Sequence, residues 1–410
     1  MSRPPLIVSC MFPDPEKGSE AGKAFAWTRA LEVYFRVHVI CLDTSAEACA
    51  KSDLCKNWNF HPVSMPTPRG PSLWWYNWYR LWCGEVIAKI GEIRQRVQPV
   101  GIHHSVMGSF RMLPRFDRTG LKYTLGPLGG GESIPAGFVL SAGFPPIVCL
   151  EELFRPSINV LTSLHPMSKP VLSGSEHCIA TTGESARIMR NAGASSVSIA
   201  FPDVIEPQKD LAEVMASRKL QTGELREGVR LIFSGRALWW KGAHLALRVL
   251  QRLRSGGSNA TLQLVTQGPA AEGWKLESKK LGVEDYVQWF GFVPRQELFK
   301  LQSQAHVFVY PTIHDSSSSA IPEAYTCGLP TVTLGIGGAG AASTPATGFN
   351  RYCPSAALWV DQAAKAIEGW IKDPATWLVA CEASAVHSRA FSQKHIEKVV
   401  GQVVVPALIP

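Results

Sequence analysis

The sequence predicts an α/β protein with two doubly wound domains, each built on a parallel sheet that helices cover on both faces. Short apolar runs that suit strands alternate with longer amphipathic stretches that suit helices, an alternation typical of parallel sheets. The alternation begins at LIVSC (6–10) and restarts at VRLIFSG (229–235). A length of 410 residues suits two domains of about 200 residues each.

The expected elements follow one another in a regular order. In the N-terminal half we expect strands at 6–10, 37–42 and 101–106, with helices at 19–34 and 74–97. In the C-terminal half we expect strands at 229–235, 261–268, 286–293, 306–312 and 330–335, with helices at 242–255, 271–282, 294–304 and 321–327. Polar residues without strand signals separate the halves, so we divide the chain into domains 1–203 and 229–390 joined by a linker, 204–228.

Ligands of such sheets bind beyond the carboxyl ends of the strands. With two facing domains, we expect the site in the cleft between them. No apolar run approaches the roughly 18 to 20 residues that cross a bilayer, and the N-terminus lacks the apolar core of a signal peptide. We therefore expect a cytoplasmic protein.

The charge and cysteine content limit the classes of partner that we expect the protein to bind. The net charge is +8, and the basic excess is concentrated in residues 51–122. Such a region can meet nucleic acid, an anionic membrane or a phosphorylated substrate, but the sequence contains no recognisable nucleic-acid-binding module. The ten cysteines are scattered without a CxxC pair, so we expect neither a disulfide framework nor a metal site and interpret most of them as small core residues.

A cationic pair follows the first strand of the C-terminal half. Strand 229–234 ends in Gly235-Arg236, and Lys241 follows where a helix is expected to begin. Arginine binds phosphate through two N–H groups, lysine acts as a point charge, and a helix N-terminus favours anions. The pattern predicts an anion site, with a solvated helix start as the structural alternative.

A second cluster lies in residues 306–334, where Asp315 and Glu323 flank a run of four serines. One carboxylate precedes a predicted helix and the other lies one to two turns inside it, so they could hold two hydroxylated parts of one ligand. Free backbone N–H groups in the serine run could bind phosphates or sugar hydroxyls. The structural alternative is an aspartate helix cap with a solvated loop, but the preceding strand and the following EAYTCGLP favour a binding site.

Several motifs occur in order and carry a resemblance. SGRALWWKG (234–242), TQGP (266–269), WFGFV (289–293) and the block from Asp315 through Glu323 to GLP (328–330) resemble the C-terminal half of the retaining GT-B glycosyltransferases of glycosyltransferase family 4. GSEAG (18–22) and GPLGGGE (126–132) resemble loops of a bacterial branch of that family. The resemblance implies the GT-B fold, two facing Rossmann-like domains with a cleft between them, and a final segment, about 391–410, that folds back onto the N-terminal domain.

The resemblance also implies roles for single residues. Arg236 and Lys241 would neutralise the donor diphosphate as the glycosidic bond breaks. Asp315 would hold hydroxyls of the donor sugar, Glu323 would bind the ribose, and His103 (or its neighbour His104) would lie near the donor sugar. The other implied donor contacts are the Gly18 loop, the backbone amides of Ser316, Ser317 and Ser318, Gly268 at a strand end, and the backbone near Phe292 for the base.

Three features qualify this assignment. Asp315 stands where glutamate is commoner in the family and reaches one methylene less, and serines replace a glycine-rich stretch and are less free at positive φ. Neighbours on a strand point to opposite faces, so we expect only one of His103 and His104 to face the cleft. A hydrogen-bonded strand-end histidine is the structural alternative for either one.

Gly335 to Gly340 formally match the GxGxxG fingerprint of dinucleotide-binding proteins, with Asp361 about 20 residues further on. The following AASTPATGFN is a poor helix start, and too little chain remains for the rest of such a domain. We therefore interpret these glycines as allowing a close backbone approach to the donor phosphates rather than as a dehydrogenase motif.

Residues 73–82 hold six aromatic residues in ten positions. A helix that is aromatic all round is usually buried. Trp and Tyr beside Arg69, Arg80 and Lys89 also suit a membrane interface with anionic headgroups. Both interpretations stay open at this point.

The sequence therefore predicts a retaining, metal-independent glycosyltransferase that needs no cofactor besides its nucleotide-diphosphate sugar. The acceptor expected from the resemblance is a polyprenyl-diphosphate-linked saccharide of exopolysaccharide or lipopolysaccharide assembly, at the inner face of the cytoplasmic membrane; a soluble saccharide is the alternative acceptor. Expected partners are the nucleotide sugar, the acceptor and an anionic membrane surface, but no nucleic acid. The alternative functions are a GT-B sugar-nucleotide epimerase or hydrolase, and a non-catalytic sugar-nucleotide or glycan-binding protein.

Overall fold

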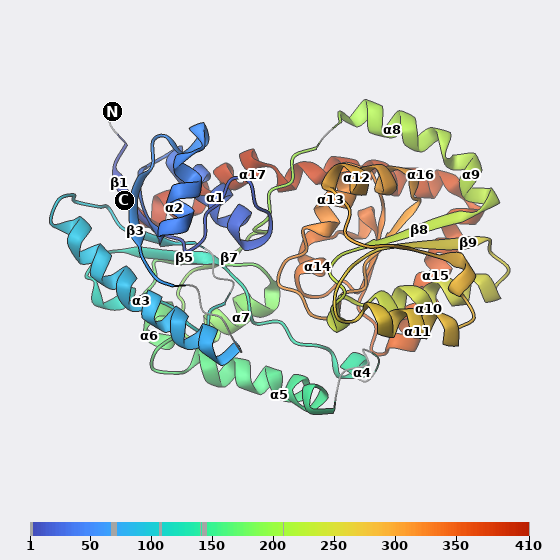
Figure 1. Cartoon of the computed structure of the whole chain (residues 1–410), viewed down its shortest axis with the longest axis horizontal. Coiled ribbons are helices and arrows are strands. Elements are labelled where there is room, and N and C mark those ends of the chain that lie inside the picture. Colours follow the sequence, from blue (N-terminus) through green and yellow to red (C-terminus); the bar gives the residue numbers. More distant parts are fainter. Residues whose placement is uncertain are drawn as a thin grey trace. The chain divides into compact units, whose positions relative to one another are not determined.

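The computed structural model describes residues 3–66, 72–105, 109–139, 141, 146–207 and 209–409, and it does not describe the side chains of residues 19, 72–76 and 146–148. The chain divides into two units, each built on one parallel β-sheet with helices against it (Figure 1). Unit 1 comprises Met1–Glu132, Pro156–Val204 and Gln393–Pro410, and unit 2 comprises Ser133–Arg155 and Ile205–Ser392. The predicted α/β class with two parallel sheets is confirmed.

Within the described residues, unit 1 has seven parallel strands in the order β3-β2-β1-β4-β5-β6-β7. The strands are β1 (Pro5–Ser9), β2 (Arg36–Leu42), β3 (Asn59–Val63), β4 (Ile102–His104), β5 (Tyr123–Leu128), β6 (His177–Ala180) and β7 (Val197–Ile199). The helices are α1 (Ser19–Glu32), α2 (Asp43–Ala50), α3 (Ser72–Arg94), α6 (Lys169–Ser173), α7 (Gly183–Asn191), α17 (Gln393–Val399) and α18 (Val405–Leu408), while α5 (Pro146–Ser163) begins in unit 2.

Both faces of the unit 1 sheet are buried, which explains its almost uninterrupted apolar strands. Side chains alternate between the faces along a strand, so Leu6 and Val8 of β1 pack in one core with Trp27 of α1. Ile7 packs on the opposite face in a second core with Trp82 of α3.

The last residues of the chain complete the first of these cores. Ile396, Val400, Val404 and Leu408 are buried in the same cluster as Trp27. They recur every four residues, because α17, a π-helical turn over Val400–Val404 and α18 form one continuous helical segment.

The aromatic stretch contributes to the core where it is described. Trp78, Tyr79 and Trp82 of α3 are buried, and Val86 and Ile90 continue the same helix face into the core. Residues 67–71 and the side chains of 72–76 lie outside the described part, so the membrane interpretation of those aromatics and of Arg69 is not addressed by the structure.

In the part of unit 2 that the structure describes, six parallel strands lie in the order β10-β9-β8-β11-β12-β13. The strands are β8 (Val229–Ser234), β9 (Ala260–Val265), β10 (Val287–Phe290), β11 (Val307–Val309), β12 (Thr331–Thr333) and β13 (Gly348–Asn350). The helices are α4 (Ala136–Val139), α8 (Leu211–Leu220), α9 (Thr222–Glu227), α10 (Ala243–Ser255), α11 (Ala271–Lys280), α12 (Arg295–Gln304), α13 (Ala320–Thr326), α14 (Gly337–Ala342), α15 (Ala356–Lys372) and α16 (Pro374–His387).

Two stretches lie elsewhere than the sequence-based division places them. Residues 133–155 group with unit 2. The stretch 204–228, interpreted above as a linker, contains α8 and α9 and from Ile205 on also belongs to unit 2. Arg218 of α8 is buried and donates hydrogen bonds to the carbonyl oxygens of Ala305 and Cys327 at 2.6 and 2.7 Å. The polar composition of this stretch thus reflects two short packed helices rather than a free connection.

Within the described ranges, no helix is both long and apolar enough to span a membrane. All ten cysteines are free thiols, and most of them are buried. Their scattered positions agree with their interpretation as small core residues.

Candidate functional site

The sheet order of unit 2 creates a switch point between β8 and β11. Chain connections leave these adjacent strands in opposite directions, and ligands of open α/β sheets bind beyond the strand ends at such a point. The loop after β8 carries Arg236 and Lys241, and the loop after β11 carries Asp315 and the serine run. The topology thus brings the two sequence clusters to one place.

Backbone hydrogen bonds tie these two loops together. The Ile313 N–H donates to the Trp240 carbonyl oxygen at 2.8 Å, and the Thr312 hydroxyl donates to the same oxygen at 3.1 Å. Trp240 directly precedes Lys241, and Thr312 and Ile313 lead to Asp315. These hydrogen bonds therefore fix the backbone from which the side chains of Lys241 and Asp315 extend.

Lys241 and Asp315 form an ion pair, with 2.6 Å between Nζ and Oδ2. The Ser318 hydroxyl donates to the same oxygen at 2.6 Å. Only 16% of the lysine side chain and 13% of the aspartate side chain is exposed. Burial tends to lower the pKa of Lys241, but Tyr310 and Asp315 outweigh it and raise the pKa above its usual value. Lys241 is therefore a cation over the whole physiological pH range.

The serine run is held by the glycine segment that resembled a dinucleotide fingerprint. The Gly338 N–H donates to the Asp315 carbonyl oxygen at 2.6 Å. A Cβ at Gly338 would lie 2.5 Å from the backbone nitrogen of Ser317, so this position has room only for glycine. At Gly338, then, the close approach is to the protein's own backbone.

Glu323 lies in the first turn of α13, beyond the serine run. Its Oε1 is 3.6 Å from Nε of Arg295, at the start of α12. Phe292, in the loop before α12, exposes 83% of its surface. Sequence reasoning missed Arg295, because an arginine one residue after a proline carries no signal of its own.

Arg236 is exposed and forms no ion pair with a described residue. Gly268, after β9, packs against the neighbouring Ala237, where a Cβ would lie 2.8 Å from the carbonyl oxygen. The structure thus brings Arg236 and Gly268 to the same strand ends as Lys241, with the guanidinium open to solvent.

His103 and His104 lie in unit 1 on β4 and point to opposite faces of its sheet. His103 Nδ1 is 2.8 Å from the Thr124 hydroxyl, and its ring stacks on Trp27. His104 Nδ1 is 3.1 Å from the Ser9 hydroxyl. Both rings are buried, and burial lowers the pKa of His103 to about 3 and that of His104 to about 4. Both are hydrogen-bonded core histidines in this structure, and neither imidazole is accessible to solvent.

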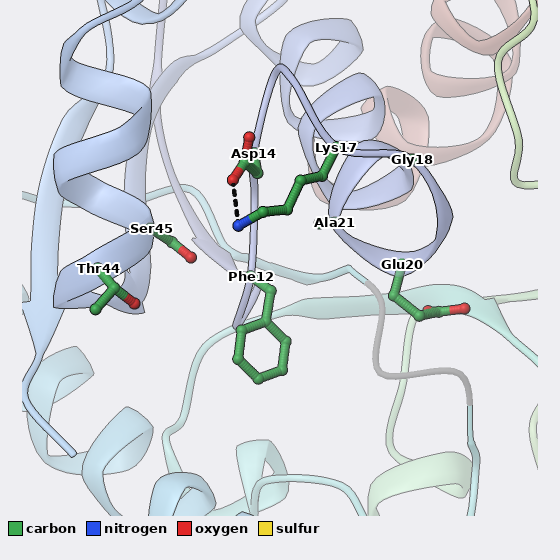
Figure 2. A pocket seen from close by; sticks show the side chains of 8 residues that line it. All are labelled: Phe12, Asp14, Lys17, Gly18, Glu20, Ala21, Thr44 and Ser45. Carbon is green, nitrogen blue, oxygen red and sulfur yellow. Dashed lines mark ion pairs between the residues drawn. The ribbon is translucent and has the colours of Figure 1, made fainter. Parts of the chain in front are cut away.

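Gly18 lines a pocket of about 330 Å³ in unit 1, beyond the carboxyl ends of β1 and β2 (Figure 2). Gly18 immediately precedes α1, and the space beside its Cα is open. The lining residues are Phe12, Asp14, Lys17, Gly18, Glu20, Ala21, Thr44 and Ser45.

The pocket combines an aromatic ring, hydroxyl groups and neutralised charges. Asp14 pairs with Lys17 at 2.9 Å, as Figure 2 shows, and Glu20 pairs with Lys23 at 3.1 Å. The Ser45 side chain is 7% exposed and points into the pocket. A serine hydroxyl that faces a pocket can donate to and accept from a ligand.

Comparison with known proteins gives a family match that lies within unit 2. Residues 219–384 match the family model described as glycosyl transferases group 1. The 2-deoxystreptamine glucosyltransferase of Streptomyces kanamyceticus is 25% identical over 222 residues, which are 51% of this chain and 56% of that protein. The chain thus aligns with little more than half of this curated relative.

Two solved structures resemble the whole chain. Anabaena Alr3699/HepE in complex with UDP has a TM-score of 0.61 at 15% identity, with 98% of this chain and 99% of that chain covered. WaaG, a glycosyltransferase involved in lipopolysaccharide biosynthesis, has a TM-score of 0.59 at 12% identity, with 96% and 100% covered. At this identity the likeness concerns the fold. The chain therefore has the GT-B fold of these glycosyltransferases, and its residues 219–384 are similar to the family described as glycosyl transferases group 1.

Proposed function

We propose that this protein is a retaining glycosyltransferase that moves a sugar from a nucleotide-diphosphate donor to an acceptor hydroxyl. The observation that carries the proposal is the partly buried Lys241–Asp315 pair at the switch point of unit 2, within the region that matches the group 1 family. A fixed cation beside a carboxylate suits a ligand that is anionic at one end and hydroxylated at the next.

In this proposal the donor diphosphate binds Lys241 and Arg236. Asp315 accepts hydrogen bonds from hydroxyls of the donor sugar, and Glu323 does so from the ribose. The backbone amides of Ser316 to Ser318 contact sugar and phosphate, and the base stacks near the exposed Phe292. UDP is the first nucleotide to test, because the Anabaena structure of the same fold is a complex with UDP.

Catalysis in this proposal is stabilisation of the leaving group. As the bond to the anomeric carbon breaks, negative charge develops on the diphosphate, and in this proposal Lys241 and Arg236 stabilise it. The acceptor hydroxyl then attacks from the face that the phosphate leaves and passes its proton to a phosphate oxygen. His103 would need its imidazole exposed to take part directly, since the ring is buried beneath Trp27.

We propose further that the saccharide end of the acceptor binds in the pocket around Ser45. A hexose ring needs an apolar face to stack on and hydrogen-bonding groups for its hydroxyls, and Phe12, Thr44 and Ser45 offer both. Lys17 pairs with Asp14, and Lys23 is shared between Glu20 and Asp203. The pocket therefore has no excess of positive charge, which suits the saccharide part of a lipid-linked acceptor better than its diphosphate. The basic excess of residues 51–122 is available for that diphosphate or for an anionic membrane surface.

The test is a thermal-shift screen of the whole protein against UDP, GDP, ADP and their common sugars, repeated on Glu323→Ala. A nucleotide at 100 times its Kd stabilises the protein by about 2.7 kcal/mol, which corresponds to a Tm increase of about 5 to 10 °C. We expect one nucleotide to give this shift and the variant to lose it, while the exposed Lys275→Ala keeps it. A folded protein that responds to no nucleotide would overturn the proposal.

Product analysis separates transfer from the related reactions. With the stabilising sugar nucleotide and no acceptor, a hydrolase releases free sugar and an epimerase changes the sugar. A transferase leaves the donor largely intact until an acceptor saccharide is added. Rapid acceptor-independent turnover would replace the transferase proposal.

A further inference from the structure

Ser318 is the most buried residue of the serine run. Only 2% of it is exposed, whereas Ser316, Ser317 and Ser319 are half-buried. Its hydroxyl donates to Oδ2 of Asp315 at 2.6 Å. The side chain of Ser318 is therefore part of the site's internal hydrogen bonding, although the sequence pointed only to its backbone amide.

The backbone on either side of this contact is fixed. The Ile321 N–H donates to the Ser318 carbonyl oxygen at 3.1 Å in the turn that leads into α13, and Ile321 is fully buried. At the other end, the Gly338 N–H donates to the Asp315 carbonyl oxygen at 2.6 Å. Because serine has a short side chain, a fixed backbone leaves its hydroxyl little freedom to move.

Two donors share one oxygen of the Asp315 carboxylate. The Lys241 ammonium donates to the same Oδ2, also at 2.6 Å. The other oxygen, Oδ1, accepts no hydrogen bond within the described part of the chain, and it is not buried. Both oxygens of a carboxylate are acceptors, so Oδ1 is the one left to accept a hydrogen bond from a ligand.

The Ser318 hydroxyl decides which carboxylate oxygen is left. The torsion that turns an aspartate carboxylate has broad minima, so rotamer preference alone does not fix its plane. Lys241 reaches Asp315 through a flexible four-carbon stem, and its ammonium can follow a rotation of the carboxylate. The Ser318 hydroxyl cannot follow, so such a rotation would break its hydrogen bond. Without that hydroxyl, Oδ1 and Oδ2 could exchange places.

We propose that Ser318 is a positioning residue, which holds Oδ2 of Asp315 so that Oδ1 is presented to a hydroxyl group of the donor sugar. The inference deepens the proposed function and rests on it, since it assumes that Asp315 binds the donor sugar. Ser318 donates its only hydroxyl proton to Asp315, so its side chain does not donate to the sugar. Its hydroxyl should therefore affect recognition of the sugar and not of the nucleotide.

The test compares the affinities for a sugar nucleotide and for its nucleoside diphosphate by isothermal titration calorimetry. The nucleotide is whichever of UDP, GDP and ADP stabilises the wild type, with the common sugar derivative that gives the largest Tm increase. The quantity of interest is the Kd of the sugar nucleotide divided by the Kd of the nucleoside diphosphate. In Ser318→Ala we expect this ratio to rise about tenfold, as the loss of a hydrogen bond to a charged group does.

A double-mutant cycle shows whether Ser318 acts through Asp315. In the Asp315→Ala background, Ser318→Ala should change the ratio by less than about twofold, because the group that it positions is gone. If Asp315→Ala does not fold, the ratios of Ser318→Ala and of its control decide the question.

Ser319→Ala is the matched control. Ser319 is the next residue of the run and directly precedes α13, and its hydroxyl makes no hydrogen bond that caps this helix. Removing it should leave the ratio within about twofold of the wild type. A general loosening of the loop in Ser318→Ala would weaken binding of the nucleoside diphosphate as well, and the ratio would then stay constant.

Each outcome has one meaning. A tenfold rise of the ratio in Ser318→Ala, absent from Ser319→Ala and from the Asp315→Ala background, supports the inference. An unchanged ratio in Ser318→Ala, or an equal rise in the control or in the Asp315→Ala background, overturns it while the proposed function stands. A wild type that binds none of the three nucleotides overturns the proposed function and this inference with it.

Discussion

The ammonium of Lys241 and the carboxylate of Asp315 meet at 2.6 Å although 74 positions separate them in the sequence. The pair lies where β8 and β11 end side by side, and two hydrogen bonds to the Trp240 carbonyl oxygen join the loops that carry it. The contact therefore depends on the sheet order. A variant that breaks it should affect both the stability of the fold and the proposed donor site.

Removing one partner of this pair should cost stability and nucleotide binding together. Lys241→Met leaves a mostly buried carboxylate without its cation, so we expect the free energy of unfolding to fall by about 3 kcal/mol. Lys241→Met combined with Asp315→Asn should recover part of that stability but none of the nucleotide affinity. Urea unfolding and calorimetric titration measure the two effects, and a double variant that also recovered binding would contradict the donor site.

Acid should destabilise unit 1 through its buried histidines. The pKa of His103 is lowered to about 3 by burial, whereas an unfolded histidine titrates near 6.5, so the unfolded state binds a proton that the folded state excludes. The stability is therefore full above about pH 6.5 and falls as the pH drops towards 3. His103 alone accounts for about 2 kcal/mol between pH 7 and pH 5.

Urea unfolding at the two pH values checks this expectation with two variants. His103→Gln should lose less stability between pH 7 and pH 5 than the wild type, whatever its stability at pH 7. The exposed, non-titrating Leu54→Gln should keep the pH dependence of the wild type. A His103→Gln variant with an unchanged pH dependence would show that this ring is not buried in its neutral form.

A methyl group at Gly338 should disturb the serine loop. In Gly338→Ala the new Cβ would lie 2.5 Å from the Ser317 backbone nitrogen, so the backbone must shift, which we expect to cost about 1 to 3 kcal/mol and to weaken nucleotide binding. Gly369 of α15 has open space around it, and Gly369→Ala should stabilise the helix by about 0.5 to 1 kcal/mol. If both variants show the same stability and affinity, the proposed tight contact is absent.

Filling the pocket of unit 1 should block saccharide binding and leave nucleotide binding intact. We expect saturation-transfer NMR to detect at least one of methyl glucoside, methyl mannoside, methyl galactoside and N-acetylglucosamine on the wild type. Ser45→Leu should abolish that signal, and Ser173→Leu, on the exposed surface of α6, should keep it. A signal that survives Ser45→Leu would place the saccharide elsewhere.

The sequence predicted those parts of the fold that depend on local pattern. Strand β8 and helix α10 were expected because a short apolar run is followed by a longer amphipathic stretch. The stretch 204–228 was interpreted as a linker because it is rich in charged residues and shows no clear helical periodicity of apolar residues. Its two short helices bury few side chains, among them Val214, Arg218 and Leu225. A helix of this length is defined by what it packs against, which is not visible in its own residues.

The prediction of site residues from the sequence has the same limit. Lys241, Asp315 and Glu323 could be chosen from charge and spacing near strand ends, and the structure brings the first two into contact. Ser45 could not be chosen, because a serine in a helix is common, and its interest arises only from its place in the pocket of unit 1. His103 was placed by the resemblance, but its orientation depends on how Trp27 of α1 packs over β4.

The packing of α17 and α18 has a consequence for folding during synthesis. Ile396, Val400, Val404 and Leu408 complete the core around Trp27, so the strands of unit 1 cannot close that core when they leave the ribosome. Unit 2, whose residues all precede Gln393, can finish first. The N-terminal sheet must therefore wait with part of one apolar face uncovered until α17 and α18 have been synthesised, and exposed apolar surface of this kind makes a folding intermediate prone to aggregation.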